Sequence, residues 1–333
     1  MEVWNSLLAL ANTYPSPHNS QPMRVRIVDE TKAELLYDKA CGLPAESYGI
    51  PFGFVTVGIF LELCRLAAQT LGKRLEYVAT LQADMDFADP TLHPCAVMTL
   101  EPDPWPAEFP AELIRRRQTS RLPYSSQTVP APLLHEIQQE ARQAGYMWHY
   151  SAEAATVDQV VAVNQKTLFY DLEEPAVRKE IGSWLRYSRR EATRKRDGLS
   201  AECMGVPGPV LSLFIKLHWL WRLPVLGPFA RSTYLATMKG VRQIAWITGP
   251  FAANTDYAAA GRLLIRIWLK LSQAGVALHP FGSVITNARA HQEFCAIVGE
   301  DESTGMAWML MRLGYSGRPP VAHRRPLDTV LVG

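Results

Sequence analysis

The sequence predicts an α+β protein built from two similar halves that pair with each other. Residues 24–28 and 34–37 have the composition of two strands joined by a polar turn, which predicts a hairpin. Two long apolar segments, residues 54–71 and 258–273, have the composition of buried helices, and a glycine follows each. Residues 101–110 (EPDPWPAEFP) contain four prolines and predict an irregular linker between the halves.

In the first half, predicted as residues 1–105, apolar residues at helical spacing predict a helix over 3–11. Pro15 and Pro17 prevent that helix from continuing, so a stiff loop follows. Gly72 ends the apolar helix, and residues 75–80 and 96–100 are predicted as short strands.

In the second half, predicted as residues 106–333, the same order recurs. Residues 130–144 predict a helix opened by proline, and residues 147–150 predict a strand. The helix over 258–273 and a strand over 308–313 then match 54–71 and 96–100. We expect two copies of one unit, with an insertion over residues 184–250 in the second copy.

Composition limits the class of protein. The 34 Lys and Arg residues against 32 Asp and Glu give a net charge of +2, which does not suggest a nucleic-acid partner. The five cysteines are widely spaced without a C-x-x-C pair, and no secretory leader precedes them, so we expect neither a disulfide framework nor a structural zinc site. A reducing cytoplasm is the expected location.

Residues 210–230 are apolar and aromatic, yet they do not predict a membrane span. Lys216, His218 and Arg222 interrupt the segment, and Pro224 and Pro228 break it, so no run of about 18 to 20 apolar residues survives. A buried helical hairpin or lid is one reading, and an interfacial amphipathic segment is the other.

Three segments carry polar side chains suited to binding. Residues 15–22 (PSPHNSQP) hold hydrogen-bonding groups between prolines, although an ordinary polar turn has the same composition. Residues 115–121 (RRRQTSR) and 323–328 (HRRPLD) are basic clusters. Guanidinium groups and hydroxyls suit a phosphate monoester, whereas a solvated charge run is the plain alternative for the first cluster.

Other chemistries have no motif support. The sequence contains no G-x-S-x-G, H-E-x-x-H or G-x-x-x-x-G-K-[ST]. His218, His279 and Cys64 lie in apolar surroundings, where packing explains them better than metal binding or nucleophilic catalysis.

Taken together, these segments resemble the FMN-binding nitroreductase family. The loop over 15–22 is similar to that family's P-S-x-x-N-x-Q-P-W signature, with Met23 in place of the tryptophan, and residues 117–121 are similar to its R-x-S-x-[RK] phosphate motif. Residues 277–283 (ALHPFGS) resemble its P-[IL]-x-G loop. Gly314 and Tyr315, with residues 324–327 (RRPL), resemble its G-Y…K-x-R-x-P-L ending.

The order of the motifs resembles a longer, duplicated branch of the family. Ordinary members carry the arginine motif before the polar loop, whereas here the polar loop comes first. The resemblance implies a nitroreductase-like fold in which two half-domains, each an antiparallel-rich sheet with helices, pack as a pseudo-dimer within one chain. It implies one FMN per chain, because no arginine motif precedes Pro15 to complete a reciprocal site.

The resemblance also implies roles for single residues. Arg117, Thr119 and Arg325 would bind the FMN phosphate, with Arg324 or His323 in support, and Arg121 would lie near the flavin N1 and O2 edge. The resemblance assigns cofactor contacts to Ser16, Asn19, Arg117, Thr119, Arg121, Pro280, Phe281, Gly282, Arg324 and Arg325. It assigns no dedicated catalytic acid or base and no metal ligand, because the cofactor carries the hydride chemistry.

Three functions stay open at this point. The first is an FMN-dependent oxidoreductase acting on a small organic substrate, with NADH or NADPH as a candidate reductant and either a monomer or a homodimer as the assembly. The second is a protein that stores or sequesters FMN beneath a lid formed by residues 184–250. The third is a membrane-surface partner protein that uses residues 214–229.

Overall fold

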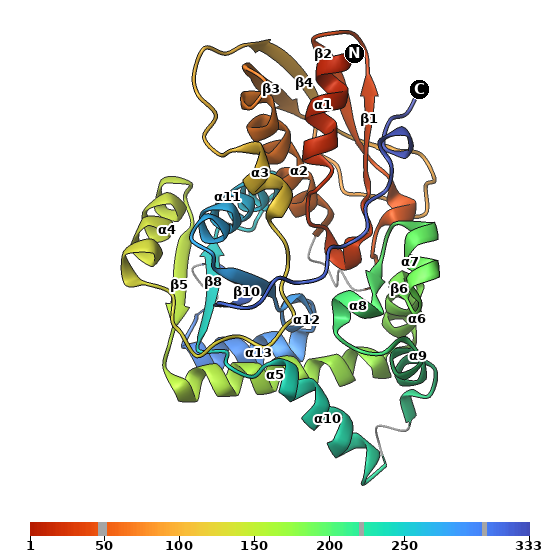
Figure 1. Ribbon diagram of the computed structural model, residues 1–333, viewed down its shortest axis with the longest axis vertical. Helices are drawn as coiled ribbons and strands as arrows, with labels where there is room; N and C mark the ends of the chain where they lie inside the picture. Colours follow the sequence, from red (N-terminus) through yellow and green to blue (C-terminus); the bar gives the residue numbers. More distant parts are fainter. Residues whose placement is uncertain (46–51, 220–222, 302–304) are drawn as a thin grey trace.

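The structure is a computed structural model that describes residues 1–45, 52–219, 223–301 and 305–333. It contains two four-stranded antiparallel sheets, each accompanied by helices, and one hydrophobic core that runs through both units (Figure 1). This arrangement confirms the predicted α+β class and the two similar halves.

The first half forms one sheet with the strand order β1-β2-β4-β3. The hairpin predicted over 24–37 is present, since Met23 pairs with Tyr37 and Ile27 pairs with Ala33. Its elements are α1 (Glu2–Ala11), β1 (Met23–Ile27), β2 (Lys32–Tyr37), α2 (Phe52–Gln69), β3 (Lys73–Ala79) and β4 (His93–Pro102).

The second half repeats that topology, because its sheet has the order β5-β8-β10-β9. In both halves the long helix lies between the second and third strands along the chain, so α2 corresponds to α11 and β4 to β10. The elements are α4 (Ala131–Gln143), β5 (Met147–Ser151), β8 (Gln243–Gly249), α11 (Asn254–Gln273), β9 (Ala277–Pro280) and β10 (Met306–Gly314); α3 (Ala111–Arg116) precedes them, and α12 (Gly282–Thr286) and α13 (Ala288–Val298) lie between β9 and β10.

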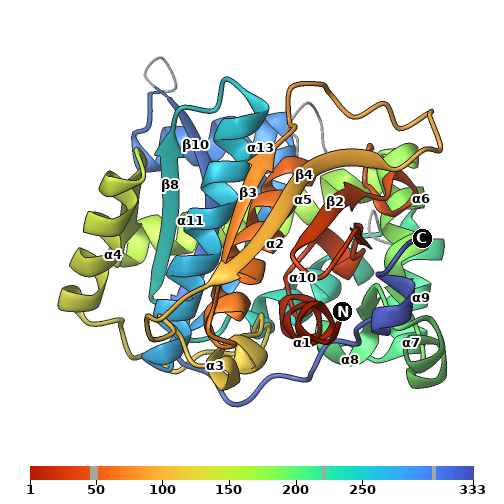
Figure 2. The same ribbon diagram turned by 90° about the horizontal axis from the view of Figure 1, so that it is seen from above.

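The two halves meet along α2 and α11, which lie between the sheets (Figure 2). Two glycines permit the close approach. A Cβ at Gly58 would lie 1.8 Å from the Ala258 carbonyl oxygen, and a Cβ at Gly261 would lie 2.1 Å from that of Val55. Because no side chain fits at such distances, the glycines bring the two helix backbones into contact and fix how the halves pair.

The boundaries of two predicted segments are wrong. The predicted linker begins too early, because Glu101 and Pro102 belong to β4. At that end β4 pairs only with β3, so the missing Pro102 N–H breaks no bond to β2. The predicted insertion begins and ends too late, because the chain already leaves the second sheet after Ser151, and residues 243–249 form β8 at the centre of that sheet.

The chain between β5 and β8 leaves the second sheet over residues 152–242. It is mainly helical, and its two short strands form a separate parallel pair. Its elements are α5 (Ala154–Glu173), α6 (Pro175–Trp184), β6 (Leu185–Arg186), α7 (Arg189–Lys195), β7 (Leu199–Ser200), α8 (Ala201–Met204), α9 (Gly208–Lys216) and α10 (Leu226–Thr237). We call this segment the excursion. It reaches from the second sheet toward the polar loop of the first half (Figure 1).

The C-terminal tail leaves β10 and returns to the first half, where both termini lie (Figure 1). Val25 of β1 donates a backbone hydrogen bond to Val330 and accepts one from Val332, at 2.9 and 3.0 Å. The tail therefore extends the edge of the first sheet, and residues 323–325 pass the polar loop on the way.

By length and composition one described helix, α2, is apolar enough to cross a membrane, but 78% of that stretch is buried inside the protein. The segment 210–230 forms parts of α9 and α10, and residues 220–222, which include Arg222, lie outside the described residues. The reading of this segment as a fully buried hairpin is wrong, since Trp219 is 52% exposed and Val225 is 76% exposed, although Leu211 is buried.

Candidate functional site

The polar loop has an unusual backbone. Pro17–Asn19 form a 3-10 turn, and His18, Asn19 and Gln21 all have φ near +50°. Residues other than glycine rarely adopt this left-handed backbone conformation, so contacts around the loop must hold it there. One such contact is internal, since the Ser16 hydroxyl accepts a hydrogen bond from the Gln21 N–H at 3.0 Å.

Left-handed backbone also occurs outside this loop. Two further non-glycine residues with a left-handed backbone are Arg196 of the excursion and Met309 of β10. Gln21 donates its amide hydrogen bond to the Arg196 carbonyl at 3.0 Å, and Met309 precedes Leu310, whose carbonyl accepts from the Phe281 N–H. Within the described part of the chain, all five such residues therefore lie beside segments that the sequence singled out.

The C-terminal tail is hydrogen-bonded along the polar loop. The Asn19 side chain donates to the His323 carbonyl at 2.9 Å and accepts from the Arg324 guanidinium at 2.9 Å. The Gln21 side-chain oxygen accepts from the Arg325 N–H at 2.9 Å. The polar loop and the C-terminal basic motif lie near opposite ends of the sequence, yet they are hydrogen-bonded to each other in the structure.

Arg117 and Arg324 converge on the end of α1. Both donate to the Thr13 carbonyl oxygen, Arg117 at 2.7 Å and Arg324 at 3.1 Å, and Arg324 also donates to the Tyr14 carbonyl at 2.7 Å. The Arg117 side chain is buried and lies 4.5 Å from the centroid of the Trp268 ring, whereas Arg324 is partly buried. Two guanidinium groups from different motifs therefore donate to the same carbonyl oxygen.

This pair of cations has no negative counterpart among the described residues, where neither guanidinium is ion-paired to a carboxylate. Burial lowers the pKa of Arg117 to about 9, and the nearby charge of Arg324 adds to the effect. Burial likewise lowers the pKa of Arg324 to about 10. The Arg117 Nε has no hydrogen-bond partner in the described structure. An anion placed here would supply both the missing charge and the missing acceptor.

The rest of the arginine motif lies along β9. Thr119 forms a parallel bridge with Leu278, and the Ser120 N–H donates to the Leu278 carbonyl at 3.1 Å. Arg121 lies near the buried His279, since it contributes, after burial, to a pKa of His279 well below its usual value. His279 is therefore neutral, and Arg121 keeps its positive charge close to the loop that follows β9.

That loop combines a packed residue with an open one. Pro280 ends β9 opposite Met311, and the Phe281 ring is buried in the core. A Cβ added at Gly282 would meet no atom within 4 Å, so the backbone there borders open space. In this loop Phe281 is therefore anchored in the core, whereas the backbone at Gly282 is open.

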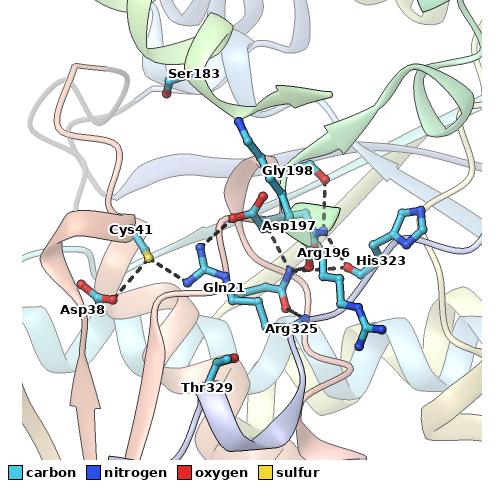
Figure 3. A network of polar contacts seen from close by, with 12 residues as sticks. Gln21, Asp38, Cys41, Ser183, Arg196, Asp197, Gly198, His323, Arg325 and Thr329 are labelled. Atoms are coloured by element: carbon cyan, nitrogen blue, oxygen red, sulfur yellow. Dashed lines mark hydrogen bonds and ion pairs between the residues drawn. The ribbon is translucent and has the colours of Figure 1, made fainter. Parts of the chain in front are cut away.

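Arg325 has other partners than Arg324, and the sequence predicts neither of these partners as a site residue. Its guanidinium forms an ion pair with Asp197 of the excursion at 2.8 Å and donates to the Cys41 sulfur at 3.2 Å (Figure 3). Asp197 also pairs with the buried Arg186 at 2.6 Å. Arg325 therefore holds the excursion, and its guanidinium already has a carboxylate partner, which it shares with Arg186.

The backbone beside Asp197 completes the attachment of the excursion. Gly198 exchanges hydrogen bonds with Asn19, its N–H to the Asn19 carbonyl and its carbonyl from the Asn19 amide, both at 3.1 Å. Gly198 has φ +72°, and a Cβ there would lie 2.3 Å from the Trp184 carbonyl oxygen. The Asp-Gly pair at 197–198 is a turn signal that the sequence does contain.

The first expected result concerns this attachment. Replacing Asp197 with Asn removes the carboxylate charge that pairs with both Arg186 and Arg325, so the excursion should open more often. We expect trypsin to cleave within residues 184–242 about tenfold faster than in the wild type, as followed by mass spectrometry. Asp328→Asn, at an exposed position, is the matched control. Equal cleavage rates would show that Asp197 does not hold the excursion.

No group of three or more His, Cys, Asp or Glu side chains that could hold a metal ion occurs among the described residues, and all five cysteines are free.

Neither the protein-family profiles nor the curated proteins contain a match to this chain. Among solved structures it is similar to the FMN and NADPH-dependent nitroreductase NfnB from a Sphingopyxis strain, with 16% identity and a TM-score of 0.43 over 67% of this chain and 97% of that one. It is also similar to a nitroreductase with bound FMN from Desulfitobacterium hafniense, with 13% identity and a TM-score of 0.37 over 65% and 94%. A third is iodotyrosine deiodinase bound to FMN and 3-iodo-L-tyrosine, with 14% identity and a TM-score of 0.38 over 65% and 94%. Similarity at this level assigns no activity to this chain.

Proposed function

We propose that this chain is an FMN-dependent oxidoreductase of the nitroreductase-like kind, with one FMN per chain and a small organic substrate. The observation that carries the proposal is the convergence of Arg117 and Arg324 on the Thr13 carbonyl without a carboxylate among their described partners. A buried cation without a counter-ion, such as Arg117, is costly in a folded protein, and a phosphate dianion would offset that cost.

The surrounding residues fit the cofactor's other parts. Arg117 and Arg324 would hold the phosphate, and the Thr119 hydroxyl of the same motif would be a further donor. Arg121 would place a positive charge near the ring edge where a reduced flavin is anionic. The flavin ring would lie over the backbone at Gly282, where an added Cβ would meet no atom within 4 Å. When bound, FMN would supply hydride and electron transfer, for which the protein provides position and charge.

In this proposal three predicted contacts change their role. Arg325 is paired with Asp197, so Arg324 takes its place as the phosphate ligand. The Asn19 amide is hydrogen-bonded through both its nitrogen and its oxygen, and the Ser16 hydroxyl is bonded to Gln21. These two side chains would hold the loop in shape, and contact with the cofactor would come from the loop's backbone.

The attached excursion favours a second candidate, a protein that binds FMN without rapid turnover. Arg196, Asp197 and Gly198 bind the polar loop and the tail, and so they bring the excursion next to the proposed site. A covered flavin would be retained yet shielded from reductants.

An anaerobic titration separates the two candidates. The protein is loaded with FMN and mixed with NADH or NADPH, and the visible absorbance band of the oxidised flavin is followed. Loss of the band within seconds supports the oxidoreductase. A band that dithionite bleaches but neither nicotinamide does supports the covered site. A protein that takes up no FMN contradicts both.

A further inference from the structure

The part of the excursion around α9 and α10 exposes many apolar side chains. Among the described side chains, fourteen large hydrophobic residues are exposed, and six of them fall within residues 210–235. They are Val210, Leu213, Trp219, Leu223, Val225 and Leu235. We call these six residues the apolar patch. Its density on one short segment sets it apart from the single exposed hydrophobic residues found elsewhere on the chain.

The patch is not the edge of the core. On α9, Leu211 packs inward in a small cluster with Val177, Ile181 and Leu185, and the partly buried Ile215 packs against the same cluster. Its neighbours Val210 and Leu213 are 41% and 47% exposed, so α9 is apolar on its outer face as well. Figure 1 shows α10 projecting beyond α5, away from the first half. The patch therefore lies where a large flat partner can reach it.

The charge of the same segment is one-sided. Residues 203–255 contain no Asp or Glu, whereas they contain the cations Lys216, Arg222, Arg231, Lys239 and Arg242. The described side chains of Lys216, Lys239 and Arg242 are exposed. A segment that combines exposed apolar side chains with cations and contains no carboxylate is complementary to an anionic lipid bilayer, where acyl chains take the apolar groups and headgroups pair with the cations.

We propose that the apolar patch docks this protein peripherally on an anionic membrane surface. The patch would enter the headgroup region, with Trp219 at the boundary between headgroups and acyl chains. A second copy of the chain is a poorer occupant, because joining two such surfaces would bring their cations together. This proposal does not depend on flavin binding.

Vesicle flotation tests the proposal with the full chain. We expect the protein to float with vesicles of phosphatidylcholine mixed with phosphatidylglycerol, to float weakly with phosphatidylcholine alone, and to lose binding as salt is raised. Val225→Glu should lower the bound fraction about tenfold, because it replaces an apolar contact with a negative charge. Trp105→Glu is the matched control, since Trp105 is 75% exposed, like Val225 at 76%, but lies on the linker.

Three results would overturn the proposal. The first is no flotation with the anionic vesicles. The second is equal flotation of the wild type and Val225→Glu. The third is a wild-type dimer, seen by light scattering, that Val225→Glu dissociates, because the patch would then be a contact between two copies. Thermal unfolding of both variants checks that they are folded.

Discussion

Replacing Arg117 with Met is expected to weaken FMN binding at least about hundredfold and, at the same time, to stabilise the FMN-free protein. Affinity falls because a buried guanidinium no longer faces the phosphate. Stability rises because a buried cation is replaced by an apolar chain of similar length. The Thr13 carbonyl keeps a donor in Arg324, so the substitution leaves that oxygen satisfied.

The gain in the free energy of unfolding should be about 1 kcal/mol, after the lost contact with the Trp268 ring is subtracted. Urea unfolding without FMN measures it, and fluorescence titration measures the affinity. Arg116→Met, on the exposed neighbouring position, is the control for both. If Arg117 served only to cap the end of α1, its loss would lower stability and leave the FMN affinity unchanged.

Replacing Glu62 with Gln is expected to lower the free energy of unfolding by about 3 to 5 kcal/mol. Glu62 lies on α2 with no exposed side-chain surface, and its carboxylate pairs with Arg65 at 2.6 Å. It also pairs across the interface with Arg262 and Arg266 of α11, at 3.3 and 3.1 Å. Loss of that charge leaves cations crowded between the two halves.

The same cluster predicts how stability depends on pH. Burial alone would raise the pKa of Glu62, but the hydrogen bonds and charges of its arginine partners lower it below the usual 4.5. A carboxyl whose pKa is lower in the folded protein stabilises it above the unfolded value and loses that contribution as the pH falls. Stability should therefore decline from about pH 4.5 downward, and less steeply in Glu62→Gln.

Urea unfolding across this pH range checks both statements, with the exposed Glu76→Gln as the control. A Glu62→Gln protein within about 0.5 kcal/mol of the wild type at neutral pH would show that the cluster does not join the halves.

Much of the fold can be predicted from the sequence, because the main elements of each half have clear local sequence patterns. The apolar helices α2 and α11 and the hairpin of β1 and β2 have clear periodicity. The sequence does not predict β8, because a short apolar run such as QIAWITG is compatible with a strand or a buried helix, and only its pairing with β5 and β10 decides between them. The glycine contacts at Gly58 and Gly261 are likewise visible only once the helices cross.

The candidate site divides in the same way. Arg117 and Arg324 stand in recognisable motifs, so the sequence selects them. The attachment of the excursion depends on contacts between residues far apart in the chain, such as Gly198 with Asn19 and Asp197 with Arg325. The local sequence does not predict which residues form these contacts. Which of two adjacent arginines faces the buried space, Arg324 or Arg325, also depends on the path of the tail.

The central claim is that Arg117 and Arg324 form one phosphate site for FMN in each chain. Comparing FMN with riboflavin tests it most directly, because the two ligands differ only in the phosphate. By calorimetry or flavin fluorescence we expect FMN to bind with a stoichiometry of one, and riboflavin to bind at least about hundredfold more weakly. Equal affinities, two FMN per chain or no binding of FMN would contradict the claim.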